Sequence, residues 1–218
     1  MAAKARLRRK YIKRPDEFLT LTNRALQWAG EHQQWVIWGG AGLVAILVTV
    51  GIASAYRAAR VRDANADLSR ALTKLDSNDY AAAANELIDL SSRWQGTDVA
   101  PVAALLGANA AVRAGDADKA IAALSGLQEH AASLPSYLQQ QLLVAWGAAL
   151  EAKQQWLDAA AKYKDAAAVG GPYTGTAVLA EARSRERGGD SDRARELYRQ
   201  AYDQFPDLPD RDLIGAKL

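Results

Sequence analysis

The chain has 218 residues, with 27 lysines and arginines against 25 aspartates and glutamates, and it contains no cysteine. The lack of cysteine excludes a disulfide scaffold, a thiolate metal site and a cysteine nucleophile. The net charge of +2 hides an asymmetry: residues 1–34 carry eight basic against three acidic side chains, whereas residues 57–218 carry 19 against 22. The positive charge is therefore concentrated in an N-terminal arm.

Residues 1–34 are expected to form a basic arm and an amphipathic lead-in helix. The basic run in residues 1–14 holds one aromatic side chain, Tyr11, which disfavours binding by base stacking. A topology signal with attraction to anionic lipid is therefore favoured over ribosomal or other RNA, and no nucleic-acid partner is expected. Pro15 then precedes residues 16–33, whose apolar side chains give an imperfect helical face; a plain polar lead-in is the alternative.

Residues 35–56 contain no charged side chain and are predicted to form a transmembrane helix. As a helix they span roughly 33 Å, close to the thickness of a bilayer core of about 30 Å. Trp35, Trp38 and Tyr56 stand at its ends, where aromatic rings favour the lipid–water boundary. Residues 53–55 resemble a signal cleavage site, but the length of the run and the 34 residues before it favour an uncleaved anchor.

The charges around this span predict its orientation. Eight basic residues precede it and five lie in the 20 residues after it, which places the N-terminus in the cytoplasm by the positive-inside rule. However, most of the arm's charge is distant from the span, and Arg57, Arg60 and Arg62 directly after it favour the opposite orientation. A cytoplasm-facing domain therefore remains an alternative.

Small residues recur every four positions within the span. On a helix they form one stripe that allows another membrane helix to approach closely, so they are a candidate docking face. The alternative is that small residues are simply frequent in membrane helices. The stripe comprises Ala41, Ala45, Thr49 and Ala53.

After the span, apolar residues at helical spacing predict that the same helix continues to about residue 75 as a stalk that begins the following domain. From Asp76 onward no segment alternates like a strand, and glycine, proline and polar turn signals divide the chain into helices. The expected fold class is all-α.

Four stretches of residues 57–218 share one layout. In each, a turn pair is followed four residues later by alanine, then by a large apolar residue and then by a further apolar residue. The turn pairs start 37, 39 and 35 residues apart. The four stretches are Asn78-Asp79…Ala83…Leu87…Leu90, Gly115-Asp116…Ala120…Leu124…Leu127, Gln154-Gln155…Ala159…Tyr163…Ala166 and Gly189-Asp190…Ala194…Tyr198…Ala201.

This layout resembles tetratricopeptide repeats, whose 34-residue period pairs two helices through small and large residues in alternation. The resemblance implies an α-solenoid of helical hairpins over residues 57–218, after the transmembrane helix 35–56. The first helix of each hairpin is expected near residues 98–113, 136–152 and 174–187, and residues after Asp207 are expected to form only a terminal cap. Spacings above 34 predict an irregular solenoid.

The layout of the whole chain resembles the ancillary SecYEG translocon subunit family. The features that carry this resemblance are the lead-in around Arg24–Trp28, the polar step at residues 31–34, the single span and the degenerate repeats. That resemblance implies a single-pass protein of the bacterial inner membrane with a periplasmic C-terminal domain. Its expected partners are the lipid bilayer and proteins, namely translocon subunits, emerging polypeptides or periplasmic chaperones. A scaffold for outer-membrane or pilus assembly and a cytoplasm-facing regulatory adaptor are the alternatives.

The sequence gives no assembled catalytic or cofactor site, so we expect neither an enzyme nor a bound cofactor or metal. The two histidines, His32 and His130, lack metal-ligand spacing, and no phosphate-loop, dinucleotide or nucleophile-elbow motif is present. The acidic residues Asp116 and Asp190 open helices and are interpreted as caps.

Polar residues on the expected first helices are candidates for a protein-binding groove, because the apolar core pattern does not require them there. Ordinary solvated residues are the alternative interpretation. The candidates are Asn109, Arg113, Gln141, Glu151, Arg183 and Arg187.

Overall fold

The computed structural model describes residues 27–209 and 211–218, and within these ranges the regular structure is helical throughout. The predicted all-α fold is therefore confirmed. The chain divides into two compact units, Met1–Arg57 and Ala58–Leu218. The basic arm and most of the predicted lead-in helix 16–33 lie outside the described residues; residues 27–31 are helical.

Helix α2 (Gln33–Asp76) contains the predicted span. It is long and apolar enough to cross a membrane, and its side chains between residues 35 and 58 are exposed. Beyond residue 58 the same helix joins the second unit, where Ala64 and Ala71 are fully buried. The prediction that the helix continues beyond the span and begins the array is confirmed.

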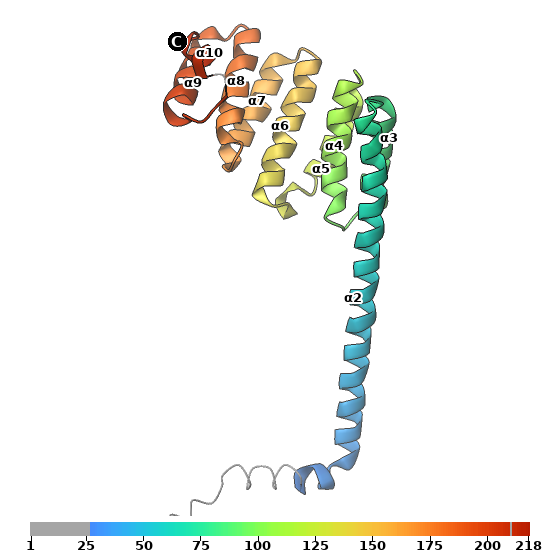
Figure 1. The fold of residues 1–218 in the computed structure, drawn as a ribbon. Helices are drawn as coiled ribbons and strands as arrows, with labels where there is room; N and C mark the ends of the chain where they lie inside the picture. Colours follow the sequence, from blue (N-terminus) through green and yellow to red (C-terminus); the bar gives the residue numbers. More distant parts are fainter. Residues whose placement is uncertain (1–26, 210) are drawn as a thin grey trace, which may run out of the picture. The chain divides into compact units, whose positions relative to one another are not determined.

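The second unit is an array of antiparallel helices (Figure 1). We call α4, α6 and α8 the first helices and α3, α5, α7 and α9 the second helices of successive hairpins; the end of α2 is the first helix of the first hairpin. The predicted bounds of the first helices are correct to within one residue. The elements are α3 (Tyr80–Arg93), α4 (Val99–Arg113), α5 (Ala117–Gln128), η1 (Ala131–Ser133), α6 (Ser136–Ala152), α7 (Trp156–Val169), α8 (Thr174–Arg187), α9 (Ser191–Gln204) and α10 (Arg211–Gly215).

The four turn pairs share one backbone geometry. The first residue of each pair adopts a positive φ of 59° at Asn78, 83° at Gly115, 60° at Gln154 and 86° at Gly189. The N–H of the second residue then bonds to the carbonyl five residues earlier, as from Asp116 to Ala111. This Schellman ending satisfies the last carbonyls of one helix and starts the next.

Three of the turn pairs have aspartate as their second residue, and in two of them its side chain caps the next helix. The side chains of Asp79 and Asp116 accept backbone N–H bonds from Ala82 and Lys119 at 3.1 and 3.0 Å. Asp190 is the N-cap residue of α9, as predicted, but its side chain makes no cap hydrogen bond, because its carboxylate accepts a bond from Arg185 at 2.8 Å.

The repeated alanine lets two helices approach, and the large residue one turn later fills the space beside it. All four alanines are at most 2% exposed and all four large residues at most 4%. At Gly147 an added Cβ would come within 2.6 Å of the Tyr163 ring, so glycine is required where α6 crosses α7. The repeat motif thus identifies the helix contacts of the array.

Most long-range polar contacts connect one hairpin to the next. Lys153 to Asp118 and Lys119 to Asn85 join residues 35 and 34 positions apart on successive hairpins. The longest spacing of the motif, 39 residues, contains the 3₁₀ turn η1 between α5 and α6. The array is therefore held together by contacts between neighbours, with one irregular junction.

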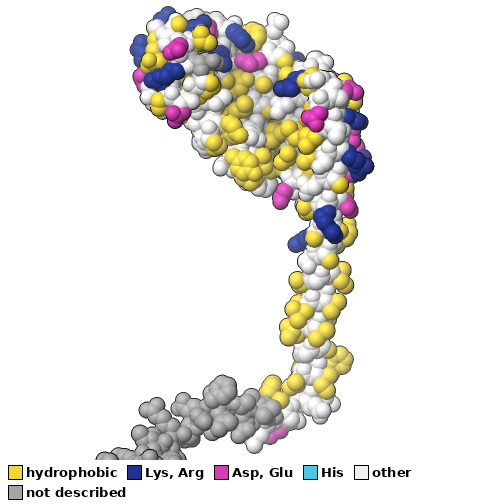
Figure 2. Space-filling model, in the orientation of Figure 1, with side chains coloured by type: hydrophobic (Ala, Val, Ile, Leu, Met, Phe, Trp, Pro, Cys, Tyr) yellow, Lys and Arg dark blue, Asp and Glu magenta, His cyan; other side chains and the backbone are white. Residues whose placement is uncertain are grey.

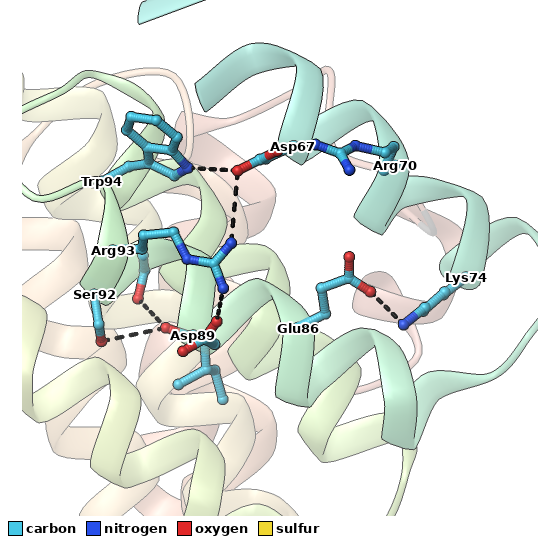
Figure 3. Close-up of polar contacts among 10 residues, drawn as sticks. Asp67, Arg70, Lys74, Glu86, Asp89, Ser92, Arg93 and Trp94 are labelled. Atoms are coloured by element: carbon cyan, nitrogen blue, oxygen red, sulfur yellow. Dashed lines mark hydrogen bonds and ion pairs between the residues drawn. The ribbon is translucent and has the colours of Figure 1, made fainter. Parts of the chain in front are cut away.

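A polar cluster fastens α2 to the corner between α3 and α4 (Figure 3). Asp67 accepts a hydrogen bond from Trp94 Nε1 at 2.9 Å and lies 3.7 Å from Arg93. Arg60 stacks on the Trp94 ring and donates to the carbonyl of Gln95 at 3.2 Å. These contacts hold the part of α2 that belongs to this unit against α3 and the turn that follows it.

The C-terminal segment caps the last hairpin. Ile214 of α10 is 2% exposed and belongs to the core formed with α9. Lys217 donates to Glu186 at 2.5 Å, and Arg211 stacks on Tyr202 at 4.0 Å. The predicted terminal cap is confirmed.

The turn geometry predicts opposite effects of two substitutions. Gln154→Gly should stabilise the array by about 0.5–1 kcal/mol, because glycine adopts a positive φ without steric cost. Gly115→Ala should destabilise it by a similar amount at the equivalent position. Thermal midpoints followed by circular dichroism test this; a lower midpoint for Gln154→Gly would show that its turn is not strained.

Candidate protein-binding face

The first helices lie side by side on one face of the array, in front of α5 and α7 in Figure 1. In the same view, hydrophobic side chains gather over α4 and α6, and many of the charged side chains lie toward the two ends of the array (Figure 2). The predicted groove residues all lie on these three helices, and we refer to this surface as the first-helix face.

Two of the predicted arginines stack on aromatic rings of the preceding second helix. Arg113 lies 5.3 Å from the ring of Tyr80, and Arg187 lies 5.2 Å from the ring of Trp156. Each arginine ends a first helix, and each aromatic residue begins the neighbouring second helix. Both arginines therefore also stabilise contacts within the array.

The contact between α5 and α6, the third place where a second helix meets the next first helix, is consistent with this pairing of arginine and aromatic residue. At the equivalent positions of α5 and α6 the chain has Ala117 and Ala152, so that the aromatic residue and the arginine are both replaced by alanine. The pairing was not predicted from the sequence, although the signal was present: the aromatic residue directly follows the turn pair in each case.

Glu151 and Arg187 are brought together by the fold. Their charged groups lie 3.8 Å apart, and Glu151 also accepts a hydrogen bond from the buried Ser184 at 2.6 Å. Burial, together with the charge of Glu151 and a hydrogen bond to it, raises the pKa of the Tyr163 hydroxyl well above its usual range. Glu151 therefore lies at the contact of three helices, α6, α7 and α8.

The other three predicted residues face solvent to different degrees. Asn109 and Arg183 are exposed on α4 and α8. Gln141 is half-buried and donates to the Tyr173 hydroxyl at 2.7 Å. That these residues bind a partner remains a prediction.

The small-residue stripe of the predicted span is exposed along α2. The Thr49 hydroxyl donates to the carbonyl of Ala45 at 2.8 Å, so it is satisfied within the helix. Ala41 lies four residues before Ala45 and Ala53 four residues after Thr49, about one helical turn in each case. Docking of another membrane helix on this stripe remains a prediction.

The titratable groups of the described residues show structural roles. No cluster of three His, Asp or Glu side chains in the described part of the chain could hold a metal ion. Hydrogen bonds from Lys217 and Tyr198 lower the pKa of Glu186, and its position on α8 joins the cap to the last hairpin. The Glu186 carboxylate therefore joins α9 and the C-terminal cap to α8.

The fold and its repeating contacts define a helical-repeat protein. The family described as Tetratricopeptide repeat-like domain matches residues 27–218, and the chain belongs to this family. The match covers both the apolar part of α2 and the array. No curated protein and no solved structure matches the chain.

The stacked pairs predict a measurable coupling. In a double-mutant cycle of Tyr80→Ala and Arg113→Ala, the two losses of stability should be non-additive by about 0.5–1 kcal/mol, because either change alone removes the stacking. Urea unfolding of the four proteins measures this coupling, and Arg183→Ala with Tyr80→Ala is the control pair. Strict additivity would show that the contact contributes nothing.

Proposed function

We propose that this chain is a membrane-anchored scaffold that binds other proteins through its repeat array and assists Sec-dependent protein export or hand-off to periplasmic chaperones. The observation that carries this proposal is helix α2, which is apolar enough to cross a membrane and also contributes Ala64 and Ala71 to the array core. Stacked helical hairpins offer an extended surface suited to polypeptides, and the family supports a role in protein–protein interaction.

The proposed location is the bacterial inner membrane, with the basic arm in the cytoplasm, residues 35–56 in the bilayer and residues 57–218 in the periplasm. The basic arm supports this orientation. Arg57, Arg60 and Arg62 directly after the span oppose it, and they are the basis of the alternative orientation. The stripe of Ala41, Ala45, Thr49 and Ala53 would then meet a membrane helix of the partner.

The export role is supported by the resemblance of the chain's layout to the ancillary SecYEG translocon subunit family. A scaffold for another envelope assembly complex would use the same anchor and the same array. A cytoplasm-facing adaptor would require the opposite orientation, so topology separates it from the other two.

The orientation is tested in the cysteine-free chain. Leu218→Cys, whose position is 42% exposed, should react in intact cells with a membrane-impermeant maleimide that enters the periplasm. Ala2→Cys is the matched control and should react only after the inner membrane is permeabilised. Labelling of Ala2→Cys alone in intact cells would instead establish the cytoplasm-facing orientation.

The partner is tested by a photo-crosslinking amino acid placed on the first-helix face. Probes at Asn109 and Arg183 should crosslink a translocon subunit, an exported chain or a chaperone, identified by mass spectrometry. Probes at the exposed second-helix positions Ser125 and Arg199 are the controls and should crosslink less. Crosslinks to outer-membrane or pilus components would favour the alternative scaffold role, and stronger crosslinks from the control positions would exclude this face.

A further inference from the structure

Two tyrosines are held exposed at neighbouring junctions of the array. Tyr137 near the start of α6 is 48% exposed, and Tyr173 directly before α8 is 37% exposed. Gln141 lies one helical turn after Tyr137 and donates to the Tyr173 hydroxyl at 2.7 Å, which connects the two. We call Tyr137, Gln141 and Tyr173 the tyrosine patch.

A fully buried amide fixes one side of this patch. Gln140 Oε1 accepts the backbone N–H of Tyr173 at 2.9 Å, and its Nε2 donates to the Ala166 carbonyl and to Thr174 Oγ1, each at 3.1 Å. Gln140 is 0% exposed. It therefore joins α6, α7 and α8 at the point where Tyr173 emerges.

The corner before Tyr173 is shaped to meet this amide. Gly171 has φ +136°, and a Cβ there would lie 3.0 Å from Gln140 Oε1. A larger residue would therefore be both strained and crowded. Because the backbone of Tyr173 is fixed before any partner binds, docking on its ring costs less conformational entropy than docking on a free loop.

The chemistry of the patch is uncharged. It offers two aromatic rings and one amide, and the following accessible residues along α6 and α8 are also uncharged: Leu143, Val144, Trp146, Ala148, Thr176 and Ala180. The ion pair of Glu151 with Arg187 lies at the opposite ends of these helices. A charged segment placed on this patch would lose its hydration without gaining a counter-charge, which costs free energy. An uncharged segment would not pay this cost.

We propose that the tyrosine patch is the docking site for an extended, uncharged apolar polypeptide segment. The proposal rests on the proposed function, in which the array binds proteins, and it names the chemistry of what is bound. Tyrosine supplies a large contact area and a polar tip, which suits it to the centre of a protein interface.

The test uses the full chain in lipid nanodiscs and a fluorescent, end-capped 12-residue peptide of alternating leucine and serine. Fluorescence anisotropy should show binding that weakens about tenfold or more in Tyr137→Ala/Tyr173→Ala. Tyr137→Phe/Tyr173→Phe should retain most of the affinity, because the rings remain. Leu213→Ala is the matched control, since it removes another exposed apolar side chain, on α10.

A second peptide, with glutamate in place of each serine, tests the charge selectivity and should bind more weakly. Three results would each overturn the proposal. They are equal affinity of the Tyr137→Ala/Tyr173→Ala variant and the unaltered chain, tighter binding of the glutamate peptide, and equal binding to empty nanodiscs. If Tyr137→Ala/Tyr173→Ala lowers the thermal midpoint, loss of binding could reflect loss of folding. A photo-crosslinking residue at position 137 then tests the site directly, and it must crosslink the leucine–serine peptide. Protein partners captured in cells by the tyrosine variants as well as by the unaltered chain would leave the proposed function intact and exclude this patch.

Discussion

The array depends on the close approach of paired helices at small residues. Ala83, Ala120, Ala159 and Ala194 are buried at the four crossings, and Gly147 meets the Tyr163 ring with no room for a Cβ. Since interiors pack at the density of organic crystals, one added methyl group at such a crossing must displace a neighbour. The four turn pairs place the next buried alanine at a fixed distance along the chain, which keeps these crossings in register.

Because the crossings connect only neighbouring hairpins, the array behaves as a one-dimensional stack. A change at one junction therefore acts first on the adjacent hairpins. The two ends need different solutions: α10 and Lys217 cover the last hairpin, whereas the first hairpin uses the end of α2 itself. The helix that is apolar enough to enter a membrane is thus also the first structural member of the repeat domain.

Much of the fold could be predicted from the sequence, because its signals are local. The turn pairs at Asn78, Gly115, Gln154 and Gly189 identify the positive-φ positions, and the buried alanines follow at a fixed distance. The side-chain contacts were harder to predict, since they join residues one repeat apart on different helices. The stacking of Arg113 and Arg187 and the role of Gln140 depend on such neighbours, and the bond of Asp190 to Arg185 joins two successive helices across a turn.

Hydrogen exchange measured on the full chain in nanodiscs tests the central claim that the part of helix α2 after residue 57 belongs to the array. The amides of residues 58–76 should exchange as slowly as those of α3 and α4, because Ala64, Asp67 and Ala71 pack or bond within the array. Rapid exchange of residues 58–76 beside a protected α3 and α4 would contradict this claim, since α2 would then be a stalk that merely carries an independent domain.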